Sequence, residues 1–143
     1  MDRFLKAALA EARKGLRSGG IPIGSVLVRQ GRIIGRGHNL RVQKGDPVAH
    51  AEITCLQNAG RIGSYKGCTL YSTLMPCYLC AGAIVQFGIR KVVAGESKTF
   101  LGAKAFMRQH GVAVKDAKNK ECVALMREFI KRQPKLWFED IGK

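Results

Sequence analysis

The sequence predicts a single α/β domain whose sheet is covered by helices on both faces. Its length of 143 residues suits one ordinary domain, because two would leave each half short of the size at which a core forms readily. Apolar residues make up 46% of the chain and charged residues 24%, which is the balance of a globular protein. Segments with helical periodicity alternate with short runs of β-branched residues, as they do in α/β folds.

The chain is expected to begin with an amphipathic helix and a hairpin. Between residues 4 and 16, apolar side chains recur at spacings of three and four, and the breaker Ser18-Gly19-Gly20 follows. Residues 23–28 and 32–37 are rich in β-branched side chains, and the turn residues Gln30-Gly31 separate them. This pattern predicts two antiparallel strands joined by a tight turn.

The middle of the chain alternates helices and strands with short connections. A loop containing Gly45 and Pro47 leads into the next expected helix. In order, the expected elements are a helix at residues 49–58, a strand at 69–73, a helix at 77–87 and a strand at 91–94. An alternation of this kind places the helices over the faces of the sheet.

The last third continues the alternation and ends in an apolar tail. We expect a helix at residues 100–110, a short strand at 112–114 and a long amphipathic helix at 120–132, which Pro134 ends. The tail at residues 136–141 reads Leu-Trp-Phe-Glu-Asp-Ile and is too apolar to remain a free end. We therefore expect it to pack back onto the domain.

The chain is strongly basic. Lys and Arg number 25 against 10 Asp and Glu, which gives a net charge of +15 and an isoelectric point near 10.1. A polyanionic partner therefore has to be considered. The cations are scattered without a long basic run, which favours a solvated basic surface with non-specific polyanion binding.

Cysteine usage and hydropathy indicate a cytoplasmic protein. The five cysteines are an odd number, and no export signal precedes them, so reduced thiols or metal ligands are expected in place of paired disulfides. No apolar run approaches the roughly 20 residues that span a bilayer, and no association with a membrane is expected.

Two short motifs carry the chemistry, namely His50-Ala51-Glu52 and the run from Pro76 to Cys80. Cys77 and Cys80, three residues apart on the first turn of a helix, place both sulfurs on one face, and the helix N-terminus favours their thiolate forms. With His50 as the third protein ligand, this set suits one zinc ion. The fourth tetrahedral position is then left for water, as in a catalytic zinc site.

Glu52 stands beside this expected metal site, where a base is needed. The combination of HxE with PCxxC is the known pattern of zinc-dependent nucleobase deaminases, in which the glutamate is the acid and base and is not a ligand. Zinc lowers the pKa of its bound water toward neutrality. Glu52 is expected to accept a proton from that water and to return protons to the ring nitrogen and the leaving amine.

Beyond the zinc motifs, the chain resembles the fungal-type cytosine deaminases of the cytidine-deaminase-like superfamily over nearly its whole length. The segments that carry the resemblance are Ile21-Pro22-Ile23-Gly24, Gly35-Arg36-Gly37-His38-Asn39, Arg41, Gln43-Lys44-Gly45, His50-Ala51-Glu52-Ile53, Ala81-Gly82-Ala83-Ile84 and Trp137-Phe138-Glu139-Asp140-Ile141-Gly142. The resemblance implies a three-layer α/β/α sandwich with a mixed sheet of about five strands, a homodimer, and a role in pyrimidine salvage.

The resemblance also implies a set of functional residues. Zinc would be held by His50, Cys77 and Cys80, and Glu52 would carry protons. The substrate would be free cytosine, which would be converted to uracil and ammonia. The residues implied around the pyrimidine are Asn39 and the backbone N–H of Ala51 at its edge, Ile23 against its ring, and Phe100, Trp137 and Asp140 closing the pocket.

One position departs from the pattern of the family, and several other functions remain open. Met75 precedes Pro76 where a small polar residue is expected, which predicts a bulkier or less polar pocket wall. A tRNA adenosine deaminase would share the zinc motifs and explain the charge through phosphate contacts. Guanine, another amino-heterocycle or cytidine are further substrates to consider. A zinc-stabilised interaction module without catalysis is the alternative from a different class.

Overall fold

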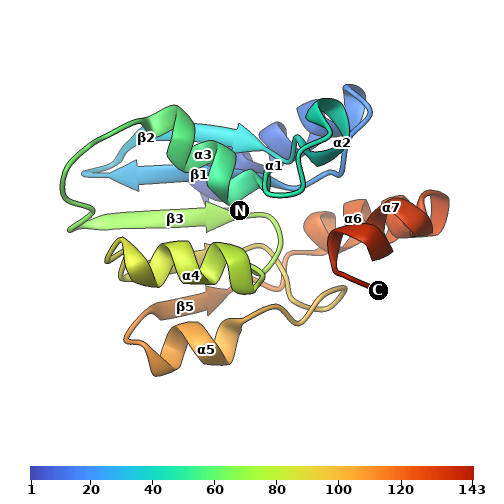
Figure 1. Ribbon diagram of the computed structural model, residues 1–143. Coiled ribbons are helices and arrows are strands. Elements are labelled where there is room, and N and C mark those ends of the chain that lie inside the picture. Colours follow the sequence, from blue (N-terminus) through green and yellow to red (C-terminus); the bar gives the residue numbers. More distant parts are fainter.

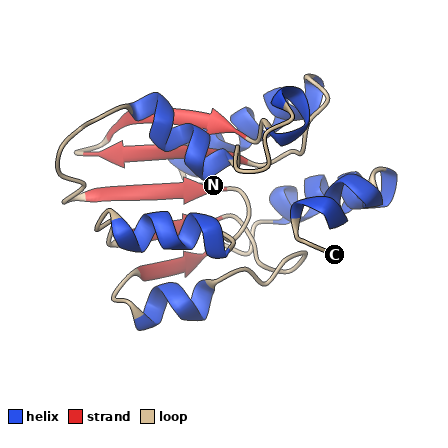
Figure 2. Ribbon diagram, viewed as in Figure 1, coloured by secondary structure: helices blue, strands red, loops and turns tan.

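The computed structural model describes all 143 residues and places a five-stranded sheet between layers of helices (Figure 1; Figure 2). The strands are β1 (Gly24–Arg29), β2 (Arg32–His38), β3 (Cys68–Ser72), β4 (Lys91–Ala94) and β5 (Ala113–Asp116). The helices are α1 (Arg3–Arg17), α2 (Arg41–Lys44), α3 (Ala51–Ala59), α4 (Tyr78–Gln86), α5 (Lys104–Gln109), α6 (Lys120–Arg132) and α7 (Pro134–Asp140).

The sheet is mixed, with strand order β2-β1-β3-β4-β5. β1 pairs antiparallel with both β2 and β3, whereas β3, β4 and β5 run parallel. The hairpin between β1 and β2 turns on Gln30 and Gly31, whose φ angles of 51° and 74° are both positive. Two such residues form the tight turn that matches the twist of antiparallel strands. The expected hairpin is therefore confirmed.

Alternate residues of the strands feed two separate core clusters, one on each face of the sheet. Leu27, Leu70 and Val92 point into the larger cluster, beneath α3, α4 and α5. Val26 and Tyr71 point to the other face, where α1 covers β1, β2 and β3. Figure 1 shows α3, α4 and α5 in front of the sheet and α1 behind it. The predicted α/β/α sandwich with a five-stranded mixed sheet is thus confirmed.

Gly24 permits the close approach of α1 to β1. A Cβ at this position would lie 2.0 Å from the backbone oxygen of Ala8 and 2.4 Å from the backbone nitrogen of Ala12. Real Cβ atoms do not approach backbone atoms so closely, so any larger residue would push the helix away from the sheet.

A third core cluster lies beyond the strand ends and joins the C-terminal helices to the rest of the domain. It contains Ile21, Ile23, Ala51, Leu74, Met126, Phe129 and Trp137. Trp137 in α7 is only 3% exposed. The tail therefore packs back as expected, but it does so as a helix that begins with Pro134 at its first position.

The structure corrects the expected start of one helix. The helix predicted at residues 100–110 begins four residues later, at Lys104. Gly102 adopts a positive φ of 66°, and the backbone N–H of Ala103 donates to the carbonyl of Pro76 at 2.9 Å. Residues 100–103 are consequently a loop. The short helix α2, in a segment expected to be a loop, is also an addition.

The remaining elements lie within two residues of their expected bounds. No helix is both long enough and apolar enough to pass through a bilayer.

Candidate active site

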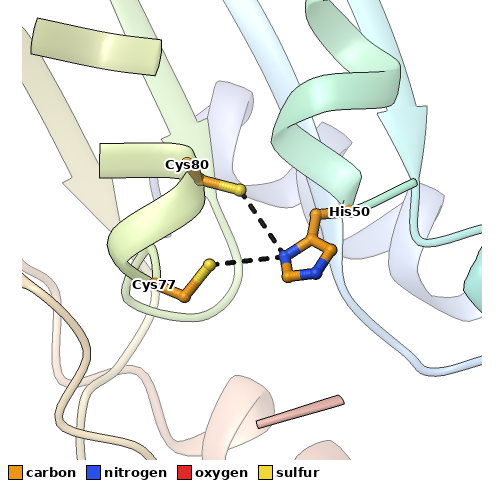
Figure 3. A group of neighbouring side chains, drawn as sticks. All are labelled: His50, Cys77 and Cys80. Carbon is orange, nitrogen blue, oxygen red and sulfur yellow. Dashed lines mark hydrogen bonds between the residues drawn. The ribbon is translucent and has the colours of Figure 1, made fainter. Parts of the chain in front are cut away.

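Three potential metal ligands converge where α3 and α4 begin. His50 is the residue before α3, Cys77 is the residue before α4, and Cys80 lies in the first turn of α4. The Nδ1 atom of His50 lies 3.3 Å from Sγ of Cys77 and 3.7 Å from Sγ of Cys80. Figure 3 shows the imidazole of His50 pointing between the two sulfurs. All three donor atoms lie within 4.8 Å of one another.

The spacing of these donor atoms fits a zinc ion. Zinc bonds of roughly 2.0–2.1 Å to nitrogen and 2.3 Å to sulfur, at tetrahedral angles, place such atoms about 3.6 Å apart. The observed separations of 3.3 and 3.7 Å bracket this value. One nitrogen and two sulfurs are also the donor set that zinc prefers, and three protein ligands leave one position for a small molecule.

The cluster is electrostatically polarised. Hydrogen bonds from Cys80 and His50 lower the pKa of the Cys77 thiol to about 4, despite its burial. Burial alone would lower the pKa of His50. The hydrogen bond to Cys77 and the negative charge of Cys77 outweigh burial and, with smaller contributions from Asp140 and Glu52, raise this pKa to about 9. The hydrogen bond to Cys77 and burial raise the pKa of Cys80 well above its usual range. A metal ion requires both sulfurs as thiolates, so its binding releases protons.

Glu52 lies in the first turn of α3 and is 4% exposed. Burial, together with the negative charge of Cys77, raises the pKa of its carboxyl group to about 7. It is not one of the three clustered metal ligands, but it lines the same cavity as His50 and Cys77. A carboxyl group with a pKa near neutrality can both accept and donate a proton.

The cavity is small and is lined mostly by apolar side chains. Its lining residues are Ile23, Asn39, His50, Ala51, Glu52, Leu74, Met75, Cys77, Phe100, Trp137, Asp140 and Ile141. They come from segments spread over more than 100 positions of the chain. The core cluster at the strand ends contributes Ile23, Leu74 and Trp137 to the cavity wall.

Asn39 presents a hydrogen-bond donor to this cavity. The side chain is 1% exposed, and its Oδ1 atom accepts the backbone N–H of Arg41 at 2.9 Å. Because the backbone group can only donate, it fixes which side of the amide carries oxygen. The Nδ2 atom is therefore the other polar end, and it has no hydrogen-bond partner.

Asp140 presents a hydrogen-bond acceptor. Its buried Oδ1 atom has no hydrogen-bond partner and lies 3.8 Å from Nε2 of His50 and 4.0 Å from Nε of Arg41. Burial raises the pKa of this carboxyl group, and the positive charges of His50 and Arg41, together with the neighbouring side-chain amide of Asn39, offset part of the increase. Arg41 also donates to the backbone oxygens of Pro47 and Glu139. Arg41 thus ties α7 to the loop before α3.

Two aromatic rings form another side of the cavity. Phe100 and Trp137 meet edge to face, with ring centroids 5.6 Å apart and an interplanar angle of 86°. This arrangement is favourable for aromatic pairs. It links the loop after β4 to α7 across the cavity wall.

The structure brings every residue that the sequence suggested into this one region. Nine of these residues line the cavity, and Cys80 adjoins them, with its sulfur within 4.8 Å of the donor atoms of His50 and Cys77. Leu74 and Ile141 also line the cavity, although the sequence analysis did not single them out. Leu74 precedes Met75 and Ile141 follows Asp140, and this adjacency is the only sequence feature that could have indicated a place in the cavity wall. Met75, the residue that departs from the family pattern, is 1% exposed, and its side chain packs into the larger core cluster beneath α3, α4 and α5.

Comparison with known proteins identifies the family. The protein-family model described as the cytidine and deoxycytidylate deaminase zinc-binding region matches residues 1–96. The chain belongs to this family of zinc-binding deaminases. It is 44% identical over 142 residues to the cytosine deaminase of Candida albicans, and the match covers 97% of this chain and 95% of that protein.

The deaminase is also similar to proteins that act on tRNA. It is 45% identical over 97 residues to the tRNA-specific adenosine deaminase of Bacillus subtilis, which covers 66% of this chain and 60% of that protein. A solved structure from a study of A-to-I editing by tRNA:A34 deaminases superposes with a TM-score of 0.68 at 33% identity, covering 80% of this chain and 96% of that one.

We expect the purified deaminase to contain about one zinc per chain, because three protein ligands converge on a single position. Cys80→Ala should abolish zinc binding and lower the melting temperature by about 10 °C or more, since the ion stabilises the folded state. Elemental analysis and thermal unfolding measure both quantities. Cys122→Ala is the matched control, because it removes a buried thiol outside the cluster. Full zinc occupancy in Cys80→Ala would contradict the assignment.

Proposed function

We propose that this deaminase hydrolyses free cytosine to uracil and ammonia, and that residues 1–143 act as one catalytic domain. The observation that carries the proposal is the pair of buried atoms without hydrogen-bond partners in residues that line the small cavity, namely Nδ2 of Asn39 and Oδ1 of Asp140. A buried polar atom without a partner costs about 1–3 kcal/mol. A ligand that supplies both partners recovers this free energy on binding.

Free cytosine has the complementary pattern of groups. Its ring N1–H can donate to Asp140, and its carbonyl oxygen can accept from Nδ2 of Asn39. The backbone N–H of Ala51 is a second donor, because the first residue of a helix has no partner within the helix. Ile23 and Phe100 offer apolar surface to the planar ring. Together these contacts would leave the amino-bearing carbon toward the zinc ligands.

The proposed chemistry divides between the metal and Glu52. His50, Cys77 and Cys80 would hold zinc, which when bound activates water for hydrolysis. Glu52 would accept one proton from this water and deliver it to the ring nitrogen. It would then take the second proton from the hydroxyl group newly added to the ring carbon and pass it to the leaving amino group. The C–N bond to the amino group breaks as a C–O bond forms, so cytosine and water yield uracil and ammonia. Burial of Glu52 keeps its pKa near the value that both transfers need.

A tRNA adenosine deaminase is the second candidate, supported by the similarity to the Bacillus subtilis enzyme and by the net charge of +15. A polynucleotide needs an open groove for its backbone, whereas α7 places Trp137 and Asp140 at the cavity. We therefore favour the free base. The basic surface would then bind polyanions weakly, in a manner that declines steeply with salt.

We further propose a homodimer, a cytoplasmic location and a role in pyrimidine salvage. Exposed apolar side chains surround the outer side of the site, among them Tyr78 at 73%, Leu101 at 72% and Leu79 at 43% exposure. A second copy of the chain would cover such a surface. Thiolate ligands must remain reduced to hold zinc, which supports a reducing compartment.

Replacing Glu52 tests the proton-transfer role. Glu52→Gln should retain zinc and fold but lower kcat for cytosine by about 10³-fold, because the amide cannot accept and return the proton. The decrease is measured by uracil formation, with zinc content determined on the same sample. Glu11→Gln is the matched control, since Glu11 is another buried glutamate that does not line the cavity. Wild-type turnover by Glu52→Gln would place the acid and base elsewhere.

Asp140 should set the preference for the free base over the nucleoside. In cytidine the ring N1 is bonded to the sugar, so Asp140 has no donor to accept and the ribose would press against Trp137. Sites built around such a hydrogen bond reject analogues that lack it by roughly 10⁴-fold. We expect kcat/KM for cytosine to exceed that for cytidine by this order, and Asp140→Asn to reduce activity on cytosine. Equal turnover of the two substrates would contradict the assignment.

A further inference from the structure

Glu96 is a buried carboxylate that the proposed chemistry does not use. It follows β4, is 0% exposed and does not line the substrate cavity. Burying an ionised carboxylate is costly unless it accepts hydrogen bonds that replace those from water. The groups that donate hydrogen bonds to Glu96 therefore indicate its role in the structure.

All the side-chain hydrogen bonds of Glu96 go to the loop that follows it. Its Oε2 atom accepts the backbone N–H groups of Lys98 at 2.7 Å and Thr99 at 2.9 Å, and its Oε1 atom accepts the hydroxyl of Thr99. Its own backbone oxygen accepts the N–H of Met75 at 2.9 Å. The loop at residues 97–99 thus surrounds one carboxylate, and the backbone of Glu96 is in turn hydrogen-bonded to the segment that leads into α4.

The residue directly after this wrapped loop is Phe100, whose ring contacts Trp137 and lines the cavity. On its other side, the backbone N–H of Ala103 donates to the carbonyl of Pro76 at 2.9 Å. Phe100 therefore sits on a short span between two anchored points. The anchor at Ala103 joins two backbone groups, whereas the Glu96 anchor depends on a side chain. Ser97 of the same loop also donates its hydroxyl to Oδ2 of Asp116, but only Glu96 bonds to Thr99, the residue next to Phe100.

We propose that Glu96 is a positioning residue that fixes Phe100 in the wall of the substrate cavity. It acts on the affinity for the base, through the aromatic wall, and does not contact the reacting atoms. The inference rests on the proposed function only in taking Phe100 as a surface for the substrate. Three charge-assisted hydrogen bonds from one loop supply the required rigidity.

Glu96→Gln should raise KM for cytosine about tenfold while kcat stays within about twofold, with zinc retained. The glutamine keeps the volume but loses the charge that strengthens all three hydrogen bonds, and its NH₂ group would face the Thr99 hydroxyl, which would have to accept instead of donate. Thr99→Val removes only the hydroxyl bond and should raise KM by about threefold. If Glu96→Gln does not fold, this milder variant carries the test. Glu121→Gln is the control, since its carboxylate is at the surface, paired with Arg13.

A double-mutant cycle with Phe100→Ala separates positioning from a general loss of stability. If Glu96 acts through Phe100, Glu96→Gln should change KM by less than about twofold once the ring has been removed. A tenfold increase that persists in the Phe100→Ala background would overturn the proposal, as would an unchanged KM in both Glu96→Gln and Thr99→Val. Glu96→Asp, which keeps the charge, should recover part of the affinity.

Trp137 gives a readout that does not require activity, because it is the only tryptophan of the chain and it contacts Phe100. Glu96→Gln should increase the quenching of its fluorescence by acrylamide, whereas Glu121→Gln should not. Unaltered quenching in Glu96→Gln contradicts the positioning role. Absence of cytosine turnover by the wild-type protein would instead contradict the proposed function, and the quenching experiment would still test the role of Glu96.

Discussion

The starts of α3 and α4 meet beyond the carboxyl end of β3, and this meeting is the constraint on which the site depends. It brings the nitrogen of His50 and the sulfurs of Cys77 and Cys80 within 4.8 Å of one another. The parallel order of β3 and β4 supports it, because α4 must cross the face of the sheet between them. Both helices point their N-termini at the cluster, where the partial positive charge of a helix end favours thiolates.

The second constraint is the cost of the pocket itself. Nδ2 of Asn39 and Oδ1 of Asp140 are buried without partners, each at a cost of about 1–3 kcal/mol. The fold bears this cost because the core cluster at the strand ends holds α7 in place, with Trp137 only 3% exposed. These two buried groups lower the stability of the free protein, and a ligand that forms hydrogen bonds with them would raise it again, as is typical of binding sites. A substrate lacking either complementary group leaves the cost unrelieved.

The clustering of His50, Cys77 and Cys80, with Glu52 in the adjoining cavity, could be predicted from the sequence because these residues lie at fixed spacings within two helix starts. The alternation of helices and strands was equally local, so most elements appeared where their periodicity placed them. The start of α5 was not predictable, since it depends on a hydrogen bond from Ala103 to Pro76, a residue 27 positions earlier. The helical state of the tail likewise depends on the cluster that Trp137 joins.

Glu96 shows the limit of sequence patterns more clearly. Nothing in the spacing of a lone glutamate after a strand indicates that three donors of the next turn will surround it. The pocket residues Asn39 and Asp140 were found through resemblance, because a polar residue at a strand end or near a C-terminus ordinarily faces solvent. Their burial and lack of partners are properties of the assembled fold.

Ammonia release by the zinc-loaded protein from cytosine, guanine, adenine and a tRNA anticodon stem-loop, compared at equal concentrations, tests the central claim most directly. A small pocket that offers one donor at Asn39 and one acceptor at Asp140 predicts release from cytosine, with little from the two purines and none from the stem-loop. Release chiefly from the stem-loop, with inosine in the RNA, would contradict the account and show that α7 does not close the site.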